Sequence, residues 1–269
     1  MVSKIGLYAY GLVGKSPKQL NIIGIDKKSK VYPVEGDGIC VMVSKIDTNK
    51  FQDEIKKLLS KLSKTTAVIP GETEEILKSH EDVVETLMKL TSIVPFKFGT
   101  ILKNEKAALK MLRDYGKKFK KLLSKFSGKE EWGIKVYADS KKLKDYIAEN
   151  EPKLKKETEQ KRKLSAGAAY LFGRKMEEEI KDKVTARLSE IAKVIFQEAG
   201  KCAYETKINK TLPKKLTGKD KEMVLNSAYL IEKETVSQFD SQVKSLIKKY
   251  EPMGLEIEFS GPWPPYNFT

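Results

Sequence analysis

The second half of the chain contains an order of strand and helix patterns that few folds can accommodate. Short runs of alternating apolar residues predict strands at residues 131–138, 201–208, 223–233 and 255–260. Helical patterns cover about 140–200, with a break expected at Asn150–Pro152, and about 236–250. The order β-α-β-β-α-β is the ferredoxin-like arrangement, in which helices cover one face of an antiparallel sheet.

The first half predicts a different mixture of elements. Short β-branched runs separated by polar turns predict strands at residues 5–12, 20–25, 31–34 and 39–46. Helical spacing follows at about 51–62 and again after Gly71. Residues 92–102 have strand character, and a third helical pattern runs from Asn104 to about Phe126. We therefore expect an α+β protein of two domains. Residues 1–128 form a mixed α+β N-terminal domain, and residues 129–269 form a modified ferredoxin-like domain with long helices and a Pro- and aromatic-rich tail.

The chain is strongly basic. It carries 52 Lys and Arg against 37 Asp and Glu, a net charge of +15, and only four of the cations are arginine. Lysine lacks the planar fork with which arginine makes two-point contacts to bases and phosphates. The charge is also uneven, because Lys103–Lys129 holds ten cations and two anions. This segment therefore supplies more than half of the surplus.

The basic segment has the pattern of an amphipathic helix. Its apolar residues recur every three or four positions and predict one buried stripe, formed by Ala108, Leu112, Tyr115, Phe119, Leu122 and Phe126. The lysine-covered outer face has two interpretations, an ordinary solvated surface or a contact face for an acidic partner or a membrane surface. On the second interpretation, the candidate partner-binding residues are Lys117, Lys118, Lys120 and Lys121.

The cysteines and the apolar segments of the chain indicate in which cellular compartment it is expected. Cys40 and Cys202 form neither a disulfide framework nor a metal-ligand spacing, which is typical of a reducing, cytoplasmic environment. The longest apolar run, residues 5–14, is much shorter than the roughly 20 residues of a membrane-spanning helix. It resembles the hydrophobic region of a signal peptide, but no small-x-small cleavage site follows it. We expect a strand there instead.

Enzymatic motifs are incomplete. Residues 9–16, AYGLVGKS, nearly match a phosphate-binding loop, but Ala9 replaces the first glycine and Pro17 disfavours the helix that should follow. His80 is the only histidine, which excludes metal sites that need a second imidazole within one chain. No catalytic residue, cofactor or metal site is predicted.

Nucleic-acid binding is the main alternative function. A basic protein with a ferredoxin-like sheet resembles an RNA-recognition module, whose central strands carry aromatic residues that stack on bases. The strand at 223–233 offers only Tyr229, and Tyr137 and Tyr204 are the other candidates. The aromatic octamer of such modules is absent.

The C-terminal tail GPWPPYNFT is unusual in composition. Three prolines lack the N–H group that a sheet ladder needs, so we expect the chain to leave the last strand after Ser260. The aromatic side chains either cap the protein's own core or form a stiff docking segment for a hydrophobic partner. The second interpretation makes five tail residues candidates for partner binding: Trp263, Pro264, Pro265, Tyr266 and Phe268.

Four separated motifs, one of them in this tail, resemble a known family. SGPWPPYNF at the C-terminus, VPFKFGTIL at 94–102, WGIKVYAD at 132–139 and SAGAAYLFGRK at 165–175 are similar to the gas vesicle protein F/L family (GvpF/GvpL). The resemblance extends from LYAYG near the N-terminus to the tail and covers essentially the whole chain.

The resemblance implies a two-domain α+β protein with an accessory role in building gas vesicles, which are cytoplasmic gas-filled shells of a small hydrophobic coat protein. It implies no enzymatic activity and no cofactor. The expected partners are the coat protein and other gas vesicle accessory proteins, with localisation in the cytoplasm and at the gas vesicle. This chain is far more basic than the acidic, salt-loving members, so a partner surface defined by charge is not transferred.

Overall fold

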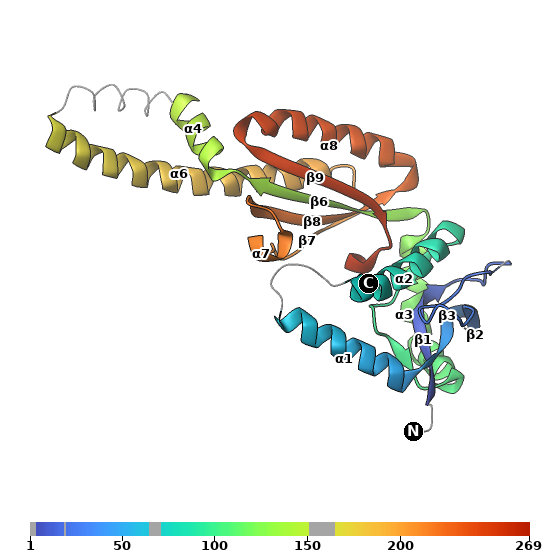
Figure 1. The fold of residues 1–269 in the computed structure, drawn as a ribbon. Helices are drawn as coiled ribbons and strands as arrows, with labels where there is room; N and C mark the ends of the chain where they lie inside the picture. Colours follow the sequence, from blue (N-terminus) through green and yellow to red (C-terminus); the bar gives the residue numbers. More distant parts are fainter. Residues whose placement is uncertain (1–3, 19, 65–70, 151–164) are drawn as a thin grey trace. The chain divides into compact units, whose positions relative to one another are not determined.

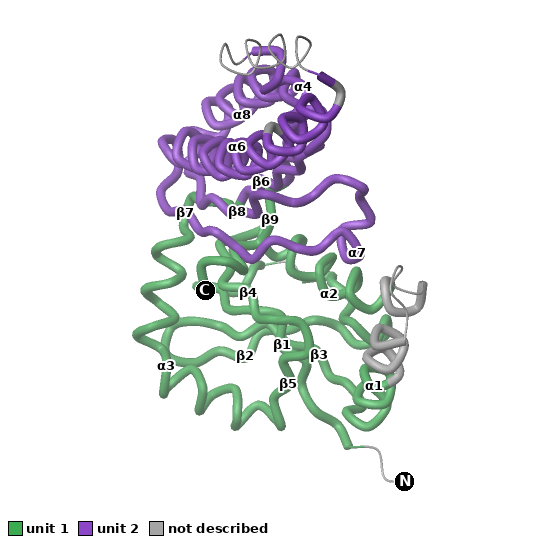
Figure 2. Tube along the Cα trace, turned by 90° about the vertical axis from the view of Figure 1, so that its left-hand side faces the viewer, with its two compact units in different colours: residues 1–131, 261–269 green, residues 132–260 purple. Residues whose placement is uncertain are grey.

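The computed structural model describes residues 4–18, 20–64, 71–150 and 165–269. The chain is an α+β protein with two antiparallel sheets and, within these ranges, seven α-helices. It divides into two compact units (Figure 2). Unit 1 consists of Met1–Glu131 and Gly261–Thr269, and unit 2 of Trp132–Ser260. The last nine residues therefore group with unit 1, whereas the sequence pattern places them with residues 129–260.

The sheet of unit 1 is built around its first strand. The strands are β1 (Ile5–Val13), β2 (Tyr32–Gly36), β3 (Ile39–Asp47), β4 (Ile93–Pro95) and β5 (Ile101–Leu102). The order is β2-β3-β1-β4, and β5 also pairs with β1. All these pairs are antiparallel. Residues 6–13 of β1 are all buried, because both faces of the sheet are covered.

Three helices cover this sheet: α1 (Thr48–Lys64), α2 (Gly71–Leu90) and α3 (Glu105–Phe126). Phe51 of α1 and Val84 of α2 pack with Tyr8 and Tyr10 in one hydrophobic cluster. Figure 2 shows α3 and α1 on opposite sides of the strands. The side chain of Asn104 caps α3 by accepting a hydrogen bond from the Ala107 N–H at 3.0 Å.

Unit 2 has the predicted order of elements (Figure 1). Its strands are β6 (Lys129–Ala138), β7 (Glu205–Ile208), β8 (Glu222–Glu232) and β9 (Leu255–Trp263), in the sheet order β7-β8-β6-β9. Its helices are α4 (Ser140–Asn150), α6 (Ala166–Gly200), α7 (Lys214–Thr217) and α8 (Val236–Tyr250). Short 3-10 turns lie at Lys233–Thr235, Glu251–Met253 and Tyr266–Phe268. The core joins residues such as Ile134, Ile195 and Phe239 from the sheet, α6 and α8.

The expected strand at residues 20–25 is wrong, since only an isolated bridge between Ile23 and Lys30 occurs there. A turn centred on Asp26 replaces it, because the Asp26 carboxylate accepts hydrogen bonds from the N–H groups of Lys28 and Ser29. The Ile25 N–H donates to the Tyr10 hydroxyl at 2.7 Å, which fixes this loop on the sheet.

Two expected boundaries also differ. The strand expected at residues 131–138 begins earlier, at Lys129, directly after Gly128 with its positive φ of 68°. The prolines of the tail predict that the last strand ends at Ser260, but β9 continues to Trp263. Because β9 is an edge strand, Pro262 can lie in it without a donor on its outer side.

The long helical region is less buried than its pattern predicts. Ile180, Val184, Ile191 and Ile195 are buried, but Tyr170 and Leu171 near the start of α6 are among the most exposed apolar residues of the described chain. Pro152 at the predicted break lies outside the described residues, and α4 is described up to Asn150, where the break is expected. Hydrophobic periodicity predicts where the helix lies, but it does not predict which of its turns are covered by the rest of the unit.

Candidate functional site

The C-terminal tail folds back on unit 1, to which its residues belong. After β9, Pro264 and Pro265 are buried and lead into the 3-10 turn Tyr266–Phe268. Phe268 is buried and Tyr266 is half-buried against the main cluster of unit 1, whereas Trp263 is 42% exposed. Most of the candidate tail residues therefore face the protein's own interior.

Tyr266 completes a chain of hydrogen bonds inside unit 1. Its hydroxyl lies 3.0 Å from Nε2 of His80, and Nδ1 of His80 lies 2.9 Å from the Tyr8 hydroxyl. The Tyr266 hydroxyl also donates to the Glu81 carboxylate at 3.3 Å. On β1, the Tyr8 hydroxyl accepts from the Gly99 N–H at 2.9 Å. The only imidazole of the chain thus links α2 to β1 and to the tail.

Burial determines the protonation states of the side chains in this hydrogen-bond network. His80 has no exposed surface, and its desolvation lowers the imidazole pKa from 6.5 to about 4. Burial also raises the pKa of the Tyr8 and Tyr266 hydroxyls above their ordinary value, and that of the Glu81 carboxyl. At neutral pH the imidazole is therefore neutral, and both phenols keep their protons. This favours a structural role for His80.

The end of the tail has further anchors in unit 1. The Asn267 backbone N–H donates to the Glu131 carboxylate at 2.9 Å, and its side-chain amide donates to the other oxygen. The Lys125 ammonium lies 5.7 Å from the centre of the Phe268 ring, in a cation–π arrangement. These contacts tie the tail to α3 and to the start of β6.

The candidate lysines on α3 do not form one equivalent set. Lys117, Lys118 and Lys121 are exposed and form no ion pair within the described ranges. The Lys120 ammonium instead lies 3.1 Å from the Asp37 carboxylate. Three of the four candidates therefore present their charge directly to solvent.

The predicted buried stripe of α3 is only partly correct. Ala108, Leu112 and Phe126 are buried as expected, but Tyr115 is 56% exposed. Gly116 takes its place at the sheet, where the Asp37 side chain approaches so closely that an added Cβ would lie within 2.3 Å of it. Tyr115 points its ring toward Phe119 instead, with 5.9 Å between ring centres.

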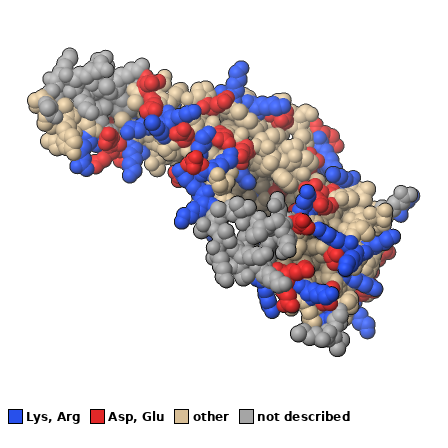
Figure 3. Space-filling model, in the orientation of Figure 1, with Lys and Arg blue, Asp and Glu red and all other residues tan. Residues whose placement is uncertain are grey.

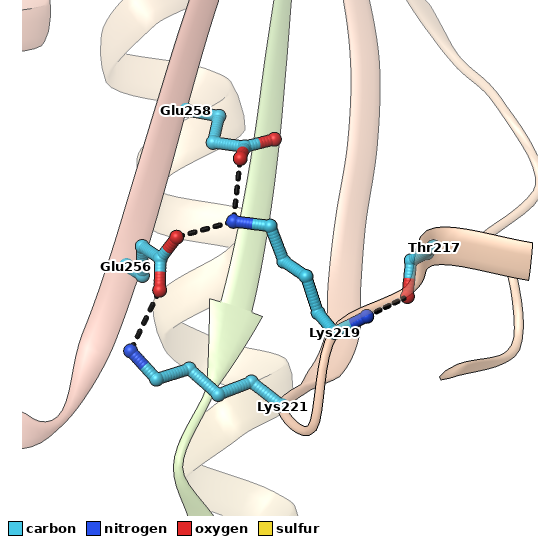
Figure 4. A network of polar contacts seen from close by, with 5 residues as sticks. All are labelled: Thr217, Lys219, Lys221, Glu256 and Glu258. Atoms are coloured by element: carbon cyan, nitrogen blue, oxygen red, sulfur yellow. Dashed lines mark hydrogen bonds and ion pairs between the residues drawn. The ribbon is translucent and has the colours of Figure 1, made fainter. Parts of the chain in front are cut away.

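A second polar cluster lies in unit 2 (Figure 4). The Lys219 ammonium bridges the carboxylates of Glu256 and Glu258 on β9, and Lys221 binds Glu256 at 2.7 Å. These hydrogen bonds raise the pKa of Lys219 and lower that of Glu256. Lys219 also lies 4.4 Å above the Tyr137 ring. The cluster fastens the segment after α7 to the edge strand.

The burial of the candidate aromatic residues argues against direct recognition of nucleic-acid bases. Tyr229 is fully buried, with its hydroxyl 3.1 Å from the Ser227 hydroxyl, and burial raises its pKa to about 12. Tyr137 is buried beneath Lys219. Of the three aromatic residues that could stack on bases, only Tyr204 is exposed.

Charges of both signs alternate along α6 on the face drawn in Figure 3. Arg187 pairs with Glu190 at 2.6 Å, and Lys183 lies 3.7 Å from Glu179. Such exposed pairs on one helix contribute little stability and keep the surface solvated. In contrast, α3 carries eight cations and only two anions.

The near-match to a phosphate-binding loop does not form a phosphate cradle. Gly14, Lys15 and Ser16 lie in an irregular segment after β1, with no helix in the described residues that follow before β2. They line a pocket of about 540 Å³ together with Glu35, whose carboxylate would repel a phosphate. In the described ranges, no cluster of three or more His, Cys, Asp or Glu could hold a metal ion, and no helix is long and apolar enough to cross a membrane.

The fold and the tail define a class of protein, a two-unit α+β protein whose C-terminal segment completes the first unit. A solved structure, that of GvpF from Microcystis aeruginosa, shares this fold with a TM-score of 0.67 and 24% identity over 98% of both chains. The structure of GvpF from Anabaena sp. gives a TM-score of 0.69, also at 24% identity.

Sequence comparison gives the same result. Gas vesicle protein F of Nostoc sp. is 25% identical over 98% of both chains. Gas vesicle protein L of a Streptomyces species is 27% identical over 71% of this chain and 68% of its own length. The family model of gas vesicle synthesis protein GvpL/GvpF matches residues 6–269. The chain belongs to the GvpL/GvpF family, as its motifs predict, and this membership implies a role in gas vesicle formation.

Proposed function

We propose that this protein is a non-enzymatic accessory factor that binds the hydrophobic coat protein during gas vesicle assembly. The observation that carries the proposal is the match of the GvpL/GvpF family model to residues 6–269. We infer that it acts in the cytoplasm and at the growing gas vesicle, together with other accessory proteins.

The physical need for such a factor follows from the coat protein itself. A subunit that is hydrophobic on its gas-facing side exposes an apolar patch before it is incorporated, and such patches drive aggregation. A partner that covers the patch reversibly keeps the subunit available for assembly. Reversible covering requires exposed apolar groups on the partner and charges that guide the encounter.

Two parts of unit 1 have these properties. Trp263 is the tail aromatic that keeps a large exposed surface. Lys117, Lys118 and Lys121 supply positive charge on α3 and form no ion pair with another residue that the structure describes. We assign partner binding to these residues, and we assign the buried Pro264, Pro265 and Phe268 and the half-buried Tyr266 to holding the tail in place.

We also infer that unit 2 is a modified ferredoxin-like domain. Its strand order β7-β8-β6-β9 is the order expected when two split βαβ units interleave in one antiparallel sheet. The modification is the long α6, which extends the first crossover. In this inference unit 2 serves as a scaffold.

Co-expression with the coat protein tests the proposal. The full chain should keep coat protein in the supernatant and co-purify with it. The variant Trp263→Ala should reduce recovery about tenfold, because an exposed aromatic anchor contributes at least ~1.4 kcal/mol to many interfaces. Leu216→Ala in unit 2 is the matched control, because Leu216 is also an exposed apolar residue, at 69%, but lies outside the tail.

The outcomes separate two conclusions. If the full chain neither solubilises nor retains coat protein, the proposed function is wrong. If it does so equally well with Trp263→Ala and with Leu216→Ala, the function stands but the tail is not part of the interface.

The alternative is a basic nucleic-acid-binding protein on the same fold, favoured only by the net charge of +15. It predicts a mobility shift of labelled RNA or DNA whose affinity falls steeply as salt rises. A protein that binds coat protein but gives no shift at low salt excludes it.

A further inference from the structure

Helix α3 has a second apolar stripe beside the one that it buries. Met111, Tyr115, Phe119 and Leu122 follow one another at spacings of three or four residues, so they lie along one side of the helix. Tyr115 is 56% exposed, and the other three are half-buried. Phe96, after β4, extends the stripe, with its ring centre 6.5 Å from that of Phe119.

This stripe adjoins the face that holds α3 on the sheet. The fully buried residues of the helix, Ala108, Leu112, Gly116, Leu123 and Phe126, form the face that packs inward. A solvated helix normally carries polar groups next to its buried face, whereas here a partly exposed apolar stripe about three turns long lies beside it. The stripe spans the twelve residues from Met111 to Leu122, a rise of roughly 16 Å at 1.5 Å per residue, which matches about three turns of a second helix.

Positive charge borders the stripe. Lys118 lies three residues after Tyr115 and four before Leu122, so its side chain lies beside both. Lys121 lies one turn after Lys118, further round the helix from the stripe. Neither lysine forms an ion pair with any residue in the described part of the chain. A ligand that covers the stripe would therefore find one unpaired cation at its edge and a second one behind it.

We propose that the Met111–Tyr115–Phe119–Leu122 stripe of α3 is a docking site for an acidic amphipathic helix of a partner protein. The partner's apolar face would cover the stripe, and its carboxylates would pair with Lys118 and Lys121. This deepens the proposed function and rests on it for the source of the helix, which is a gas vesicle protein.

The same surface suits other ligands less well. A membrane surface requires a broad apolar face that can enter the lipid, but the broad face of α3 is buried in unit 1. Nucleic acid is read mainly by arginine, whereas the cation beside this stripe is Lys118, and only one ring of the stripe, that of Tyr115, is largely exposed. An apolar stripe bordered by cations is complementary to an acidic amphipathic helix.

The experiment uses the full chain and a fluorescent designed peptide with leucine on one helical face and glutamate on the others. Anisotropy should show saturable binding that weakens with salt. Tyr115→Ser and the pair Lys118→Glu with Lys121→Glu should each weaken binding about tenfold or more. Leu109→Ser is the control on the same helix, because Leu109 is 43% exposed but lies on the opposite side of the buried face. Circular dichroism and urea unfolding verify that each variant is folded.

Specificity decides the result. A scrambled peptide of the same composition should bind at least about tenfold more weakly, because it cannot form an apolar face. Equal binding of the scrambled peptide, or equal binding to Tyr115→Ser, overturns the proposal. So does a result in which anionic vesicles or RNA bind the stripe and the peptide does not.

The source of the helix is tested separately by coat-protein capture. If the peptide binds at α3 but no coat protein is captured, the docking site stands and the proposed function fails. If coat protein is captured equally by the wild type and by Tyr115→Ser, while the peptide does not bind, the function stands and the docking site is wrong.

Discussion

The buried imidazole of His80 joins three parts of unit 1. It forms hydrogen bonds with the hydroxyls of Tyr8 on β1 and Tyr266 in the tail. Its ring also stacks on that of Tyr10, with 5.9 Å between ring centres. Glu81, the nearest ionisable neighbour on α2, contacts Tyr266 rather than the imidazole. A neutral histidine can donate from one ring nitrogen and accept at the other, which is why it fits between two hydroxyl groups.

This position predicts a pH dependence of stability. The imidazole pKa is about 4 in the folded protein and near 6.5 in the unfolded chain, so the unfolded state binds a proton first as pH falls. The free energy of unfolding should therefore decrease between about pH 6.5 and pH 4, by at most about 3 kcal/mol from this group. Below that window both states are protonated and the loss is complete.

Urea unfolding of the wild type and His80→Gln across pH 4 to 7 measures the effect. The variant lacks the titrating group, so its stability should vary less in this window. The raised pKa of Glu81 acts in the opposite direction, because the folded state binds that proton more readily. Equal pH slopes for the two proteins would show that His80 does not titrate as inferred.

At the scale of elements, the tail functions as part of the unit 1 core. The Phe268 ring is buried, and two residues outside the tail hold it: Glu131 accepts hydrogen bonds from Asn267, and Lys125 lies over the Phe268 ring. The strand β9 directs the chain toward this site and ends at Trp263. A segment that is stiff in isolation is thus held by contacts on three elements.

Replacing Phe268 by Ala should destabilise unit 1 by about 3 kcal/mol, because it leaves a cavity where a buried ring was. Trp263→Ala should cost less than about 1 kcal/mol, since much of that ring is already in water. Chemical denaturation followed by circular dichroism compares the two variants. A larger loss for Trp263→Ala would show that the exposed ring, and not Phe268, anchors the tail.

At the scale of the whole molecule, unit 1 is discontinuous in sequence. It uses residues 1–131 and then the last nine residues, with all of unit 2 inserted between them. The insertion points lie close together, because β6 and β9 are neighbouring strands and a Cβ on Gly133 would lie 3.3 Å from the Ser260 hydroxyl. Insertion of one domain into another commonly occurs where two chain ends are close.

This arrangement predicts that the tail can be reconnected directly. A protein in which a short Gly/Ser linker replaces residues 132–260 should unfold cooperatively, at a higher urea concentration than residues 1–131 alone. The difference should reflect several buried contacts, on the order of 3 kcal/mol or more. Equal midpoints for the two proteins would mean that the tail adds nothing to unit 1.

Several features were determined by the sequence alone. Alternating and helical hydrophobic patterns predict most of the helices and strands, because a side chain's local period decides which face of an element is apolar. The family was also recognisable, because four motifs keep their order along the chain. Errors occurred where local patterns compete with tertiary contacts, as at residues 20–25, where Asp26 forms a turn, and at Tyr115, where Gly116 takes the close approach to the sheet.

The destination of the tail was decided only by the tertiary structure. Its prolines and aromatic residues predict a stiff apolar segment, but they carry no information about which surface it covers. His80 and Tyr266 are separated by 186 positions, and neither residue has a local pattern that points to the other. Their hydrogen bond exists because folding brings the end of the chain to the core of unit 1, where burial selects a neutral imidazole between two phenols.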